Sequence, residues 1–401
     1  STQSRSSAAS DVYKRQSLPP EPTAYEKETS QTLLHLIRTQ IKQHNGFIPF
    51  DYYVNLVLYT PSLGYYAREH QQIGRKGDFV TAPELHPIFA QTLTEQLVPL
   101  LINGKKIIYE FGAGNGILAA DLLTYLPEQL IDDYYIIELS APLREKQRAT
   151  IQSKCPQAIN KLHHLNTLPN QLSGIVLANE VLDAIPFNLI KKNYRQFWEI
   201  GVSLGQENQL IYGEKKLEEK KAAYVAAQTY LSHCPEPYQS ELHLQQQAFI
   251  RSISERMEKA VMIIFDYGFD AQEYYLPQRS MGTMMAYYHH HSLHDPFFYP
   301  GLLDLTTHIN FSAIAEAVIQ SGADLLGYTT QSHFLFNLGI TEYMHRIRSL
   351  ASEQNYYAAT CALQTLVYPH EMGEIFKVMA WGKNNNQIWQ AFTHGDLTHK
   401  L

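Results

Sequence analysis

The sequence predicts an α/β fold with a mostly parallel sheet, because apolar runs of strand length alternate with helical segments along its middle. Helical patterns at 117–126 and 142–153 separate the first three of these runs. Right-handed crossovers would then place helices on both faces of the sheet. The four predicted strands are 107–109, 134–137, 174–178 and 261–265.

Further elements are predicted on both sides of this alternating region. Residues 25–45 carry Leu33, Ile37 and Ile41 at helical spacing and predict an amphipathic helix, and 87–101 repeats a helical pattern. The segment 205–258 is rich in Gln, Glu and Lys and predicts an inserted, mostly helical lobe. Residues 375–381 predict a late strand.

Composition excludes several classes of protein. The 401 residues carry a net charge of −7, which makes a general nucleic-acid binder improbable on electrostatic grounds. The three cysteines lie far apart and form no CxxC pair, which argues against a disulfide scaffold and a cysteine zinc site. No apolar run reaches the ~18 residues of a membrane span. We therefore expect a soluble protein from a reducing compartment.

The glycine loop after the first predicted strand is the sharpest local signal. It reads EFGAGNG over 110–116 and precedes a predicted helix, where glycines allow a ligand to approach the backbone closely. Glu138 ends the next strand and is placed to accept hydrogen bonds from ribose hydroxyls. Ile117 occupies the third glycine position of a dinucleotide motif, and Glu110 favours a cationic ligand over a pyrophosphate. S-adenosyl-L-methionine is favoured, with an NAD-linked oxidoreductase as an alternative.

Acidic residues follow the third and fourth predicted strands. Glu180 and Asp183 would share one side of a helical turn, where they could bind a cationic substrate. The alternative is a helix start, with Asn179 as the N-cap and the acids favouring the dipole. Asp266 ends the fourth strand at the same edge of the sheet, where ligands of α/β proteins bind.

Histidines and tyrosines are concentrated in a few stretches. The segment 287–295 is rich in histidine, but adjacent histidines on a strand face opposite sides, so we expect no metal site. His308 is a candidate pocket residue. Tyrosines gather at 52–66 and 287–299, and we interpret both stretches as candidate walls of an acceptor pocket or a partner surface.

Together these motifs resemble the MidA family of S-adenosylmethionine-dependent methyltransferases, which includes a mitochondrial complex I assembly factor that methylates an arginine. The resemblance runs from about Leu33 to Trp381. The matching segments are 58–59 with 64–66, 77–85 (GDFVTAPEL), 110–116 (EFGAGNG), 138–140 (ELS), 179–186 (NEVLDAIP), 266–268 (DYG), 304–308 (DLTTH), 331–340 and 372–377.

The resemblance implies a Rossmann-like, seven-stranded class I methyltransferase sheet with an N-terminal helical segment and an inserted helical lobe. The expected parts are a tail at 1–24, an N-terminal helical and cofactor-lid segment at 25–104, a cofactor-binding core at 105–204, a helical insertion at 205–258, and the remaining core with pocket elements at 259–401. Residues 1–16 contain DVYKRQ, which matches a translated sequencing adapter, so we expect them to be an artefact.

The resemblance also implies roles for single residues. Glu180, and secondly Asp183, would hold an acceptor guanidinium, while Asp266 and His308 would accept the proton that it releases. Asp78 and Thr81 would close over the cofactor. The residues expected to bind S-adenosyl-L-methionine are Asp78, Thr81, Glu110, Gly112, Gly114, Gly116, Glu138, Leu139 and Asn179.

The expected partner is a protein, with a core subunit of NADH dehydrogenase as the candidate, and neither nucleic acid nor membrane insertion is expected. The expected compartment is a bacterial cytoplasm, or the mitochondrial matrix if the source is eukaryotic. A non-catalytic, cofactor-binding assembly chaperone of a respiratory complex is the other hypothesis for the function. Oligomeric state stays open.

Overall fold

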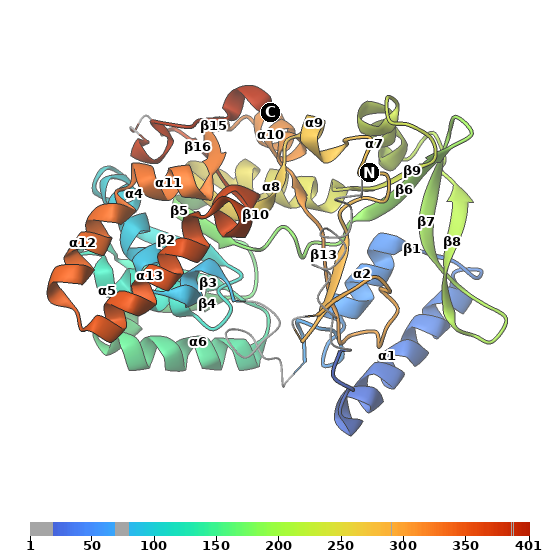
Figure 1. Ribbon diagram of the computed structural model, residues 1–401, viewed down its shortest axis with the longest axis horizontal. Coiled ribbons are helices and arrows are strands. Elements are labelled where there is room, and N and C mark those ends of the chain that lie inside the picture. The colour runs from blue at the N-terminus through green and yellow to red at the C-terminus, as the bar shows by residue number, and fades with distance from the viewer. Residues whose placement is uncertain (1–18, 69–79, 290, 386, 388) are drawn as a thin grey trace, which may run out of the picture.

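A mixed central sheet organises the computed structural model, which describes residues 19–68, 80–289, 291–385, 387 and 389–401 (Figure 1). Within these residues the sheet has eight strands, in the order β15-β16-β10-β5-β2-β3-β4, with β14 beside β10. The strands are β2 (Ile107–Phe111), β3 (Asp133–Ile137), β4 (Leu162–Leu165), β5 (Leu172–Asn179), β10 (Met257–Phe269), β14 (Ile309–Asn310), β15 (Asp324–Thr330) and β16 (Phe376–Lys383).

The strand directions match an α/β fold. Strands β4, β3, β2, β5 and β10 are parallel, and β16 runs antiparallel to both β10 and β15. All four strands predicted in the alternating region are present, and so is the late strand. The sheet has one strand more than the expected seven, because the two-residue strand β14 pairs in parallel with Gly268 and Phe269 of β10.

Helices cover both faces of this sheet, and each face has its own hydrophobic core. Alternate side chains of a strand point to opposite faces, so Ile108 joins one core and Tyr109 the other. The first core includes side chains of α4, α5, α6 and α11 to α13, and the second includes those of α8 and α10. These helices are α4 (Ile88–Asn103), α5 (Ile117–Tyr125), α6 (Ala141–Lys154), α8 (Leu244–Arg256), α10 (Phe311–Gln320), α11 (Gln331–Asn337), α12 (Ile340–Leu350) and α13 (Glu353–Val367).

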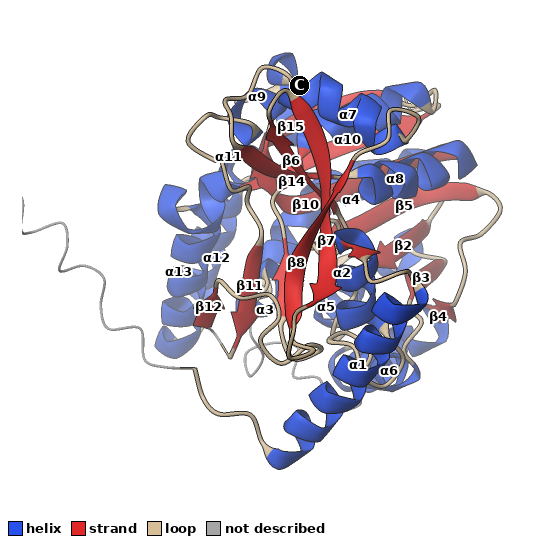
Figure 2. Ribbon diagram, turned by 90° about the vertical axis from the view of Figure 1, so that its right-hand side faces the viewer, coloured by secondary structure: helices blue, strands red, loops and turns tan. Residues whose placement is uncertain are grey.

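A second lobe combines the N-terminal helices with antiparallel strands from later in the chain, and Figure 2 brings its β7–β8 ribbon to the front. A third hydrophobic core joins Ile37 of α1, Phe50 of α2 and Ile200 of β7. The elements of the second lobe are α1 (Ala24–Gln43), β1 (Ile48–Pro49), α2 (Phe50–Tyr59), β6 (Asn188–Asn193), β7 (Gln196–Leu204), β8 (Leu210–Lys216), β9 (Tyr238–Leu242), and the small sheet of β11 (Met285–Tyr288), β12 (His291–Leu293) and β13 (Asp304–Thr306).

The prediction of a helical insertion at 205–258 is wrong in part. It contains strands β8 and β9 as well as α7 (Ala222–Leu231) and α8, so it is mixed rather than helical throughout. Strand β8 is mostly exposed, so its Glu and Lys residues reflect contact with water rather than helicity. Helix α8 belongs to the core, since Ile250 and Ile253 are fully buried beneath the central sheet.

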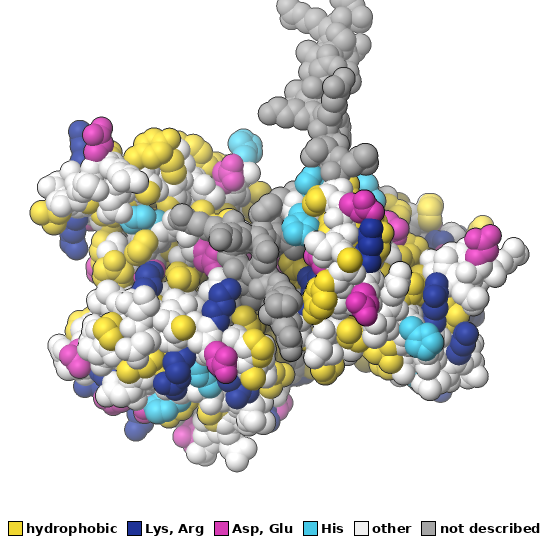
Figure 3. Space-filling view, turned by 90° about the horizontal axis from the view of Figure 1, so that it is seen from below, with side chains coloured by type: hydrophobic (Ala, Val, Ile, Leu, Met, Phe, Trp, Pro, Cys, Tyr) yellow, Lys and Arg dark blue, Asp and Glu magenta, His cyan; other side chains and the backbone are white. Residues whose placement is uncertain are grey.

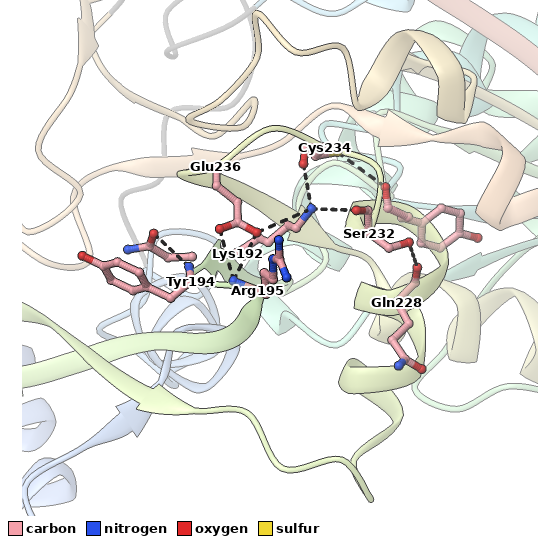
Figure 4. A network of polar contacts seen from close by, with 9 residues as sticks. Lys192, Tyr194, Arg195, Gln228, Ser232, Cys234 and Glu236 are labelled. Carbon is pink, nitrogen blue, oxygen red and sulfur yellow. Dashed lines mark hydrogen bonds and ion pairs between the residues drawn. The ribbon is translucent and has the colours of Figure 1, made fainter.

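Polar contacts attach the β6–β7 hairpin to α7 (Figure 4). Tyr194 and Arg195 have φ of 50° and 57° in the turn, and the backbone N–H of Arg195 donates to both carboxylate oxygens of Glu236. Lys192 Nζ donates to the carbonyls of Ser232 and Cys234, at 2.6 and 2.7 Å. These bonds satisfy carbonyls beyond the last turn of α7 and hold the hairpin against the helix.

Short helices complete the described chain, and none of its helices combines the length and apolar composition that crossing a bilayer requires. On the face in Figure 3, Lys and Arg side chains are interspersed with acidic and apolar ones, so the visible part of that face offers no basic stripe. The short helices are α3 (Ala82–Leu85), α9 (Ala271–Tyr274), η1 (Glu128–Leu130), η2 (Pro156–Lys161), η3 (Pro369–Gly373), η4 (Gln390–Phe392) and η5 (Thr398–Lys400).

Phe265 provides a test of the first core. Its ring meets Phe89 and Phe334 edge-on, each with centroids 5.2 Å apart, and it is 2% exposed. Phe265→Ala should lower the free energy of unfolding by about 3–5 kcal/mol, because it leaves a cavity where three aromatic rings meet. Urea denaturation measures this loss. Phe336→Ala, which removes a ring that is 48% exposed, should cost far less; equal losses would contradict the packing described here.

Candidate functional site

A pocket of about 1260 Å³ opens at the carboxyl ends of the parallel strands, where the central sheet meets the second lobe. Strands β2, β3 and β5 end in it, and segments of both lobes contribute to its walls. Its titratable and aromatic lining comprises Tyr59, Tyr65, Tyr66, Glu84, Glu110, Phe111, Glu138, Glu180, Asp183, Phe249, Tyr267, Tyr287, Asp304, His308 and Phe376.

The glycine loop forms a cradle on one wall of the pocket. Gly112, Gly114 and Gly116 have φ of +63°, +50° and +79°, which glycine adopts at little cost. A Cβ on Gly112 would lie 2.6 Å from Cγ2 of Val181. Helix α5 follows Gly116 without a side-chain cap. Backbone conformation and packing against Val181 therefore require glycine at 112, and residues 112–115 of the loop line the pocket.

Glu138 lies at the end of β3 on the same wall. Its Oε1 accepts the backbone N–H of Ser140 at 2.8 Å, and its Oε2 accepts from Nε2 of Gln147 at 3.3 Å. Leu139 is 76% exposed and lines the pocket beside it. A carboxylate with fixed oxygens next to an exposed apolar side chain suits a nucleoside, whose ribose has hydroxyl donors and whose base is apolar on its faces.

Glu110 also lines the pocket, but its carboxyl is engaged within the sheet. Its Oε2 accepts from the hydroxyl of Tyr134 at 2.6 Å, and its side chain is buried. Burial raises the pKa of Glu110 to about 7, so the group carries only part of a negative charge at neutral pH. Its predicted attraction for a cation is correspondingly weaker than that of an ordinary glutamate.

The turn after β5 presents Glu180 to the pocket. Glu180 adopts φ +52°, an unusual conformation for a residue with a side chain, and its Oε1 accepts from Nδ2 of Asn179 at 3.1 Å. Burial and the neighbouring Asp183 raise the pKa of Glu180 to about 8. A bend and a turn follow β5, so the predicted helix start with Asn179 as N-cap is wrong.

Asp183 lines the pocket three residues further along. Its Oδ2 accepts from the hydroxyls of Tyr267 and Thr306, at 2.8 and 3.1 Å. Among the described residues, none hydrogen-bonds to its buried Oδ1 or to the buried Oδ1 of Asn179. Two buried acceptors at the end of one strand favour a ligand that carries several N–H donors.

Asp266 does not line the pocket. Its Oδ2 accepts the backbone N–H groups of Leu182 and Asp183, at 2.9 and 3.3 Å. The carboxyl of Asp266 therefore supports the 180–183 turn, and no contact with the pocket supports its predicted role as a proton acceptor. Burial and the carboxyls of Asp183 and Glu180 raise the pKa of Asp266 well above its ordinary value.

His308 lines the pocket from the opposite wall. Its ring stacks on Phe269, with centroids 5.0 Å apart and an angle of 3° between the planes. Burial, helped by the charges of Arg279 and Lys377, lowers the pKa of His308 to about 4, so the imidazole is neutral near pH 7. At neutral pH the imidazole can therefore accept a proton only transiently.

Of the two residues predicted to cover the cofactor, only Thr81 can be placed. It lines the pocket directly before α3. Asp78 lies outside the described residues, as does residue 290 of the histidine-rich stretch. His289 does not line the pocket; its Nε2 lies 3.8 Å from the carboxylate of Glu26.

Asp304 and its tyrosine neighbours were not identified as site residues from the sequence. Tyr66 donates to Oδ1 of Asp304 at 2.8 Å, and Tyr59 donates to the carbonyl of Ala184 at 2.9 Å. Tyr59, Tyr65, Tyr66 and Tyr287 of the two tyrosine-rich stretches line the pocket, and their role as walls for an acceptor stays a prediction. The signals in the sequence were that excess of tyrosine and the matching segments 64–66 and 304–308, but nothing local links Asp304 to residue 66.

The charge of the lining decides which ligands fit. Six acidic residues line the pocket and, among the described residues, no lysine or arginine does. A dinucleotide would bring two phosphates into this surplus of carboxyls without a cation to meet them. S-adenosyl-L-methionine fits, because it has no phosphate and carries a sulfonium and an ammonium group.

Comparison with known proteins agrees with this chemistry. Residues 90–329 match a family described as "Putative S-adenosyl-L-methionine-dependent methyltransferase". A solved Burkholderia thailandensis protein bound to S-adenosyl-homocysteine is 39% identical, covers 96% of this chain and 100% of its own, and superposes with a TM-score of 0.91. The NAD-linked oxidoreductase alternative is therefore wrong.

Curated relatives are more distant but span most of the chain. The mitochondrial protein arginine methyltransferase NDUFAF7 of Mus musculus is 26% identical over 394 residues, which are 89% of this chain and 85% of the mouse protein. The protein of the same name from Homo sapiens is 26% identical over 390 residues, covering 88% and 84%.

Gly112 tests the cradle. Gly112→Ala should weaken binding of S-adenosyl-homocysteine at least about tenfold, because a Cβ there meets Val181 and a positive φ costs about 1–2 kcal/mol. Calorimetric titration measures the affinity, and adding Val181→Ala should restore part of it. Gly322→Ala is the matched control: it has φ +69° but no atom within 4 Å of its Cβ. Equal affinity in Gly112→Ala and the unmodified chain would contradict the assignment.

Proposed function

The chain belongs to this family of S-adenosyl-L-methionine-dependent methyltransferases, and from that premise we propose that it methylates an arginine of a protein acceptor. The observation that carries the proposal is the acidic end of the pocket, formed by Glu180, Asp183 and Asp304. A guanidinium is planar, always charged and rich in donors, so paired carboxylates bind it more specifically than they bind a single ammonium.

The contacts of these three acids leave room for such a group. Oδ1 of Asp183 has no partner in the part of the chain that the structure describes, whereas its Oδ2 accepts from two hydroxyls. Glu180 has a positive φ, and its side chain lines the pocket. The tyrosines around Asp304 supply apolar surface with polar tips, which suits the long aliphatic stem of an arginine.

The relatives support the choice of acceptor. Mouse and human relatives carry the name protein arginine methyltransferase, and the MidA resemblance implies a core subunit of NADH dehydrogenase as the acceptor. We therefore propose that the chain assists assembly of respiratory complex I, in a bacterial cytoplasm or in the mitochondrial matrix. The seven principal strands of the central sheet would then be those of a class I methyltransferase, with β14 as an addition.

We assign the cofactor to the glycine-loop side of the pocket. Gly112, Gly114 and Gly116 would let it approach, Glu138 would bind its ribose, and Leu139 would cover its base. Asn179 offers a free oxygen to its ammonium group, while Thr81 and Glu110 complete the wall. When bound, S-adenosyl-L-methionine supplies a methyl group activated by a positively charged sulfur.

The protein itself would orient the acceptor and accept the proton that the acceptor nitrogen releases. Glu180 and Asp183 would hold the guanidinium and localise its charge, which leaves one nitrogen more nucleophilic. That nitrogen must lose a proton as it gains the methyl group. Glu180, with a pKa of about 8 in the free site, is matched to accept it near neutral pH, and neutral His308 is a second acceptor.

Methyl transfer to peptides tests the proposal. The purified chain, given labelled S-adenosyl-L-methionine, should methylate arginine peptides tiled from complex I subunits and leave arginine-to-lysine copies unmodified, as mass spectrometry would show. Glu180→Gln should lower kcat/KM about 100-fold or more, because a neutral amide cannot pair with the guanidinium. S-adenosyl-homocysteine should bind this variant with nearly unchanged affinity.

Glu255→Gln, an exposed change on α8, is the matched control and should retain full activity. Full transfer by Glu180→Gln would overturn the assignment of Glu180. Cofactor binding without transfer to any arginine peptide would favour the assembly-chaperone hypothesis instead.

The raised pKa of Glu180 predicts a pH profile. Below its pKa the carboxyl is protonated and cannot pair with the guanidinium, so kcat/KM for the acceptor should rise with pH around a midpoint of about 8 in the free site. Saturating cofactor should move the midpoint below 8, because its positive charge favours the carboxylate. Arginine stays charged throughout, so no fall should follow up to about pH 10. A flat profile from about pH 5 to 9 would contradict the role of Glu180.

A further inference from the structure

Gln147 of α6 is a fully buried amide beside the proposed cofactor site. Its Nε2 donates to the carbonyl of Gly114 at 3.1 Å and to Oε2 of Glu138 at 3.3 Å. Its Oε1 lies 2.9 Å from Nε2 of His164 on β4. One side chain thus connects the glycine loop to the carboxylate at the end of β3.

The chemistry of its neighbours fixes the orientation of this amide. A carbonyl and a carboxylate can only accept hydrogen bonds, so the NH₂ group of Gln147 must face Gly114 and Glu138. Its oxygen must then face His164, which therefore carries its proton on Nε2. Burial and the charges of Arg148 and Arg144 lower the pKa of His164, which favours the neutral ring with that single tautomer.

Packing leaves the amide little freedom to move. A Cβ added at Gly116 would lie 3.0 Å from Cα of Gln147 and 3.2 Å from its Cβ, so α6 sits directly against the loop. The second oxygen of Glu138 is held by Ser140 N–H at 2.8 Å. Both oxygens of the carboxylate are therefore held from the protein side, and each keeps a lone pair for a ligand.

We propose that Gln147 is a positioning residue that holds the Glu138 carboxylate at a set angle to the glycine loop and so makes the site selective for a ribose with a free 2′-hydroxyl. This inference rests on the proposed role of Glu138 in binding the cofactor ribose. Without the Gln147 amide, the Glu138 carboxylate could turn about its last torsion and lose its alignment with the two hydroxyls. The glycine loop would also lose a bond at Gly114.

The test compares S-adenosyl-homocysteine with its 2′-deoxy analogue by calorimetry. The unmodified chain should prefer the ribose form by roughly tenfold or more, as for a hydrogen bond to a charged group. In Gln147→Leu both affinities should fall, and the preference should shrink to about twofold or less. Gln152→Leu, the same substitution at an exposed position of α6, should retain both the affinities and the preference.

His164→Phe provides a second variant in case Gln147→Leu folds poorly. It removes the donor that orients the amide at a partly exposed position, and it should lower the preference in the same direction by a smaller factor. Equal losses for both ligands in Gln147→Leu, with the preference unchanged, would overturn the inference, because a purely structural defect weakens both ligands alike.

Glu138→Ala separates the inference from the proposal on which it rests. If Glu138→Ala retains the preference for the 2′-hydroxyl, or the unmodified chain has none, the ribose role of Glu138 is wrong. If Glu138→Ala abolishes the preference while Gln147→Leu and His164→Phe retain it, Glu138 binds the ribose and only the role of Gln147 is wrong.

Discussion

The carboxyl of Asp266 anchors the arrangement of the pocket. It is almost fully buried and accepts the backbone N–H groups of Leu182 and Asp183, so it fixes the turn that follows β5. That turn holds Glu180 at a positive φ and points Asp183 toward the second lobe. A buried carboxyl without hydrogen-bond partners would destabilise the fold, so the 180–183 turn and the end of β10 stabilise each other. The acidic wall of the pocket depends on both.

Sequence predicted the elements whose signal is local. Strands β2, β3, β5 and β10 are short apolar runs between turns, and the glycine loop with Glu138 follows from the ends of two neighbouring strands. Strand β8 was missed because composition reports exposure: an exposed ribbon and an exposed helix contain the same polar residues. Strand β9 was missed although it is mostly buried, because its buried Ser240 and Glu241 interrupt any apolar run. Asp266 was placed at the correct edge, but the direction of its side chain depends on the turn that it supports.

The parts of the site that sequence could not predict come from contacts between distant segments. Tyr66 and Asp304 are 238 positions apart, yet their side chains share a hydrogen bond in the wall of the pocket. Gln147 reads as an ordinary polar residue of a polar helix, and only the fold reveals that it is fully buried between the loop and Glu138. A periodic pattern predicts which face is buried but not which partner a buried polar group meets there.

These long-range contacts divide the pocket into two ends with different origins. Glycine loop, Glu138 and Gln147 belong to the α/β core, whereas Asp304 and the tyrosines come from the second lobe and its small sheet. Asp183 joins the two, since it follows a core strand and accepts from Thr306 of β13. The core end is therefore suited to the cofactor of the family. Under the proposed function the acceptor would meet the second-lobe end, whose shape depends on the packing of α2 against β13.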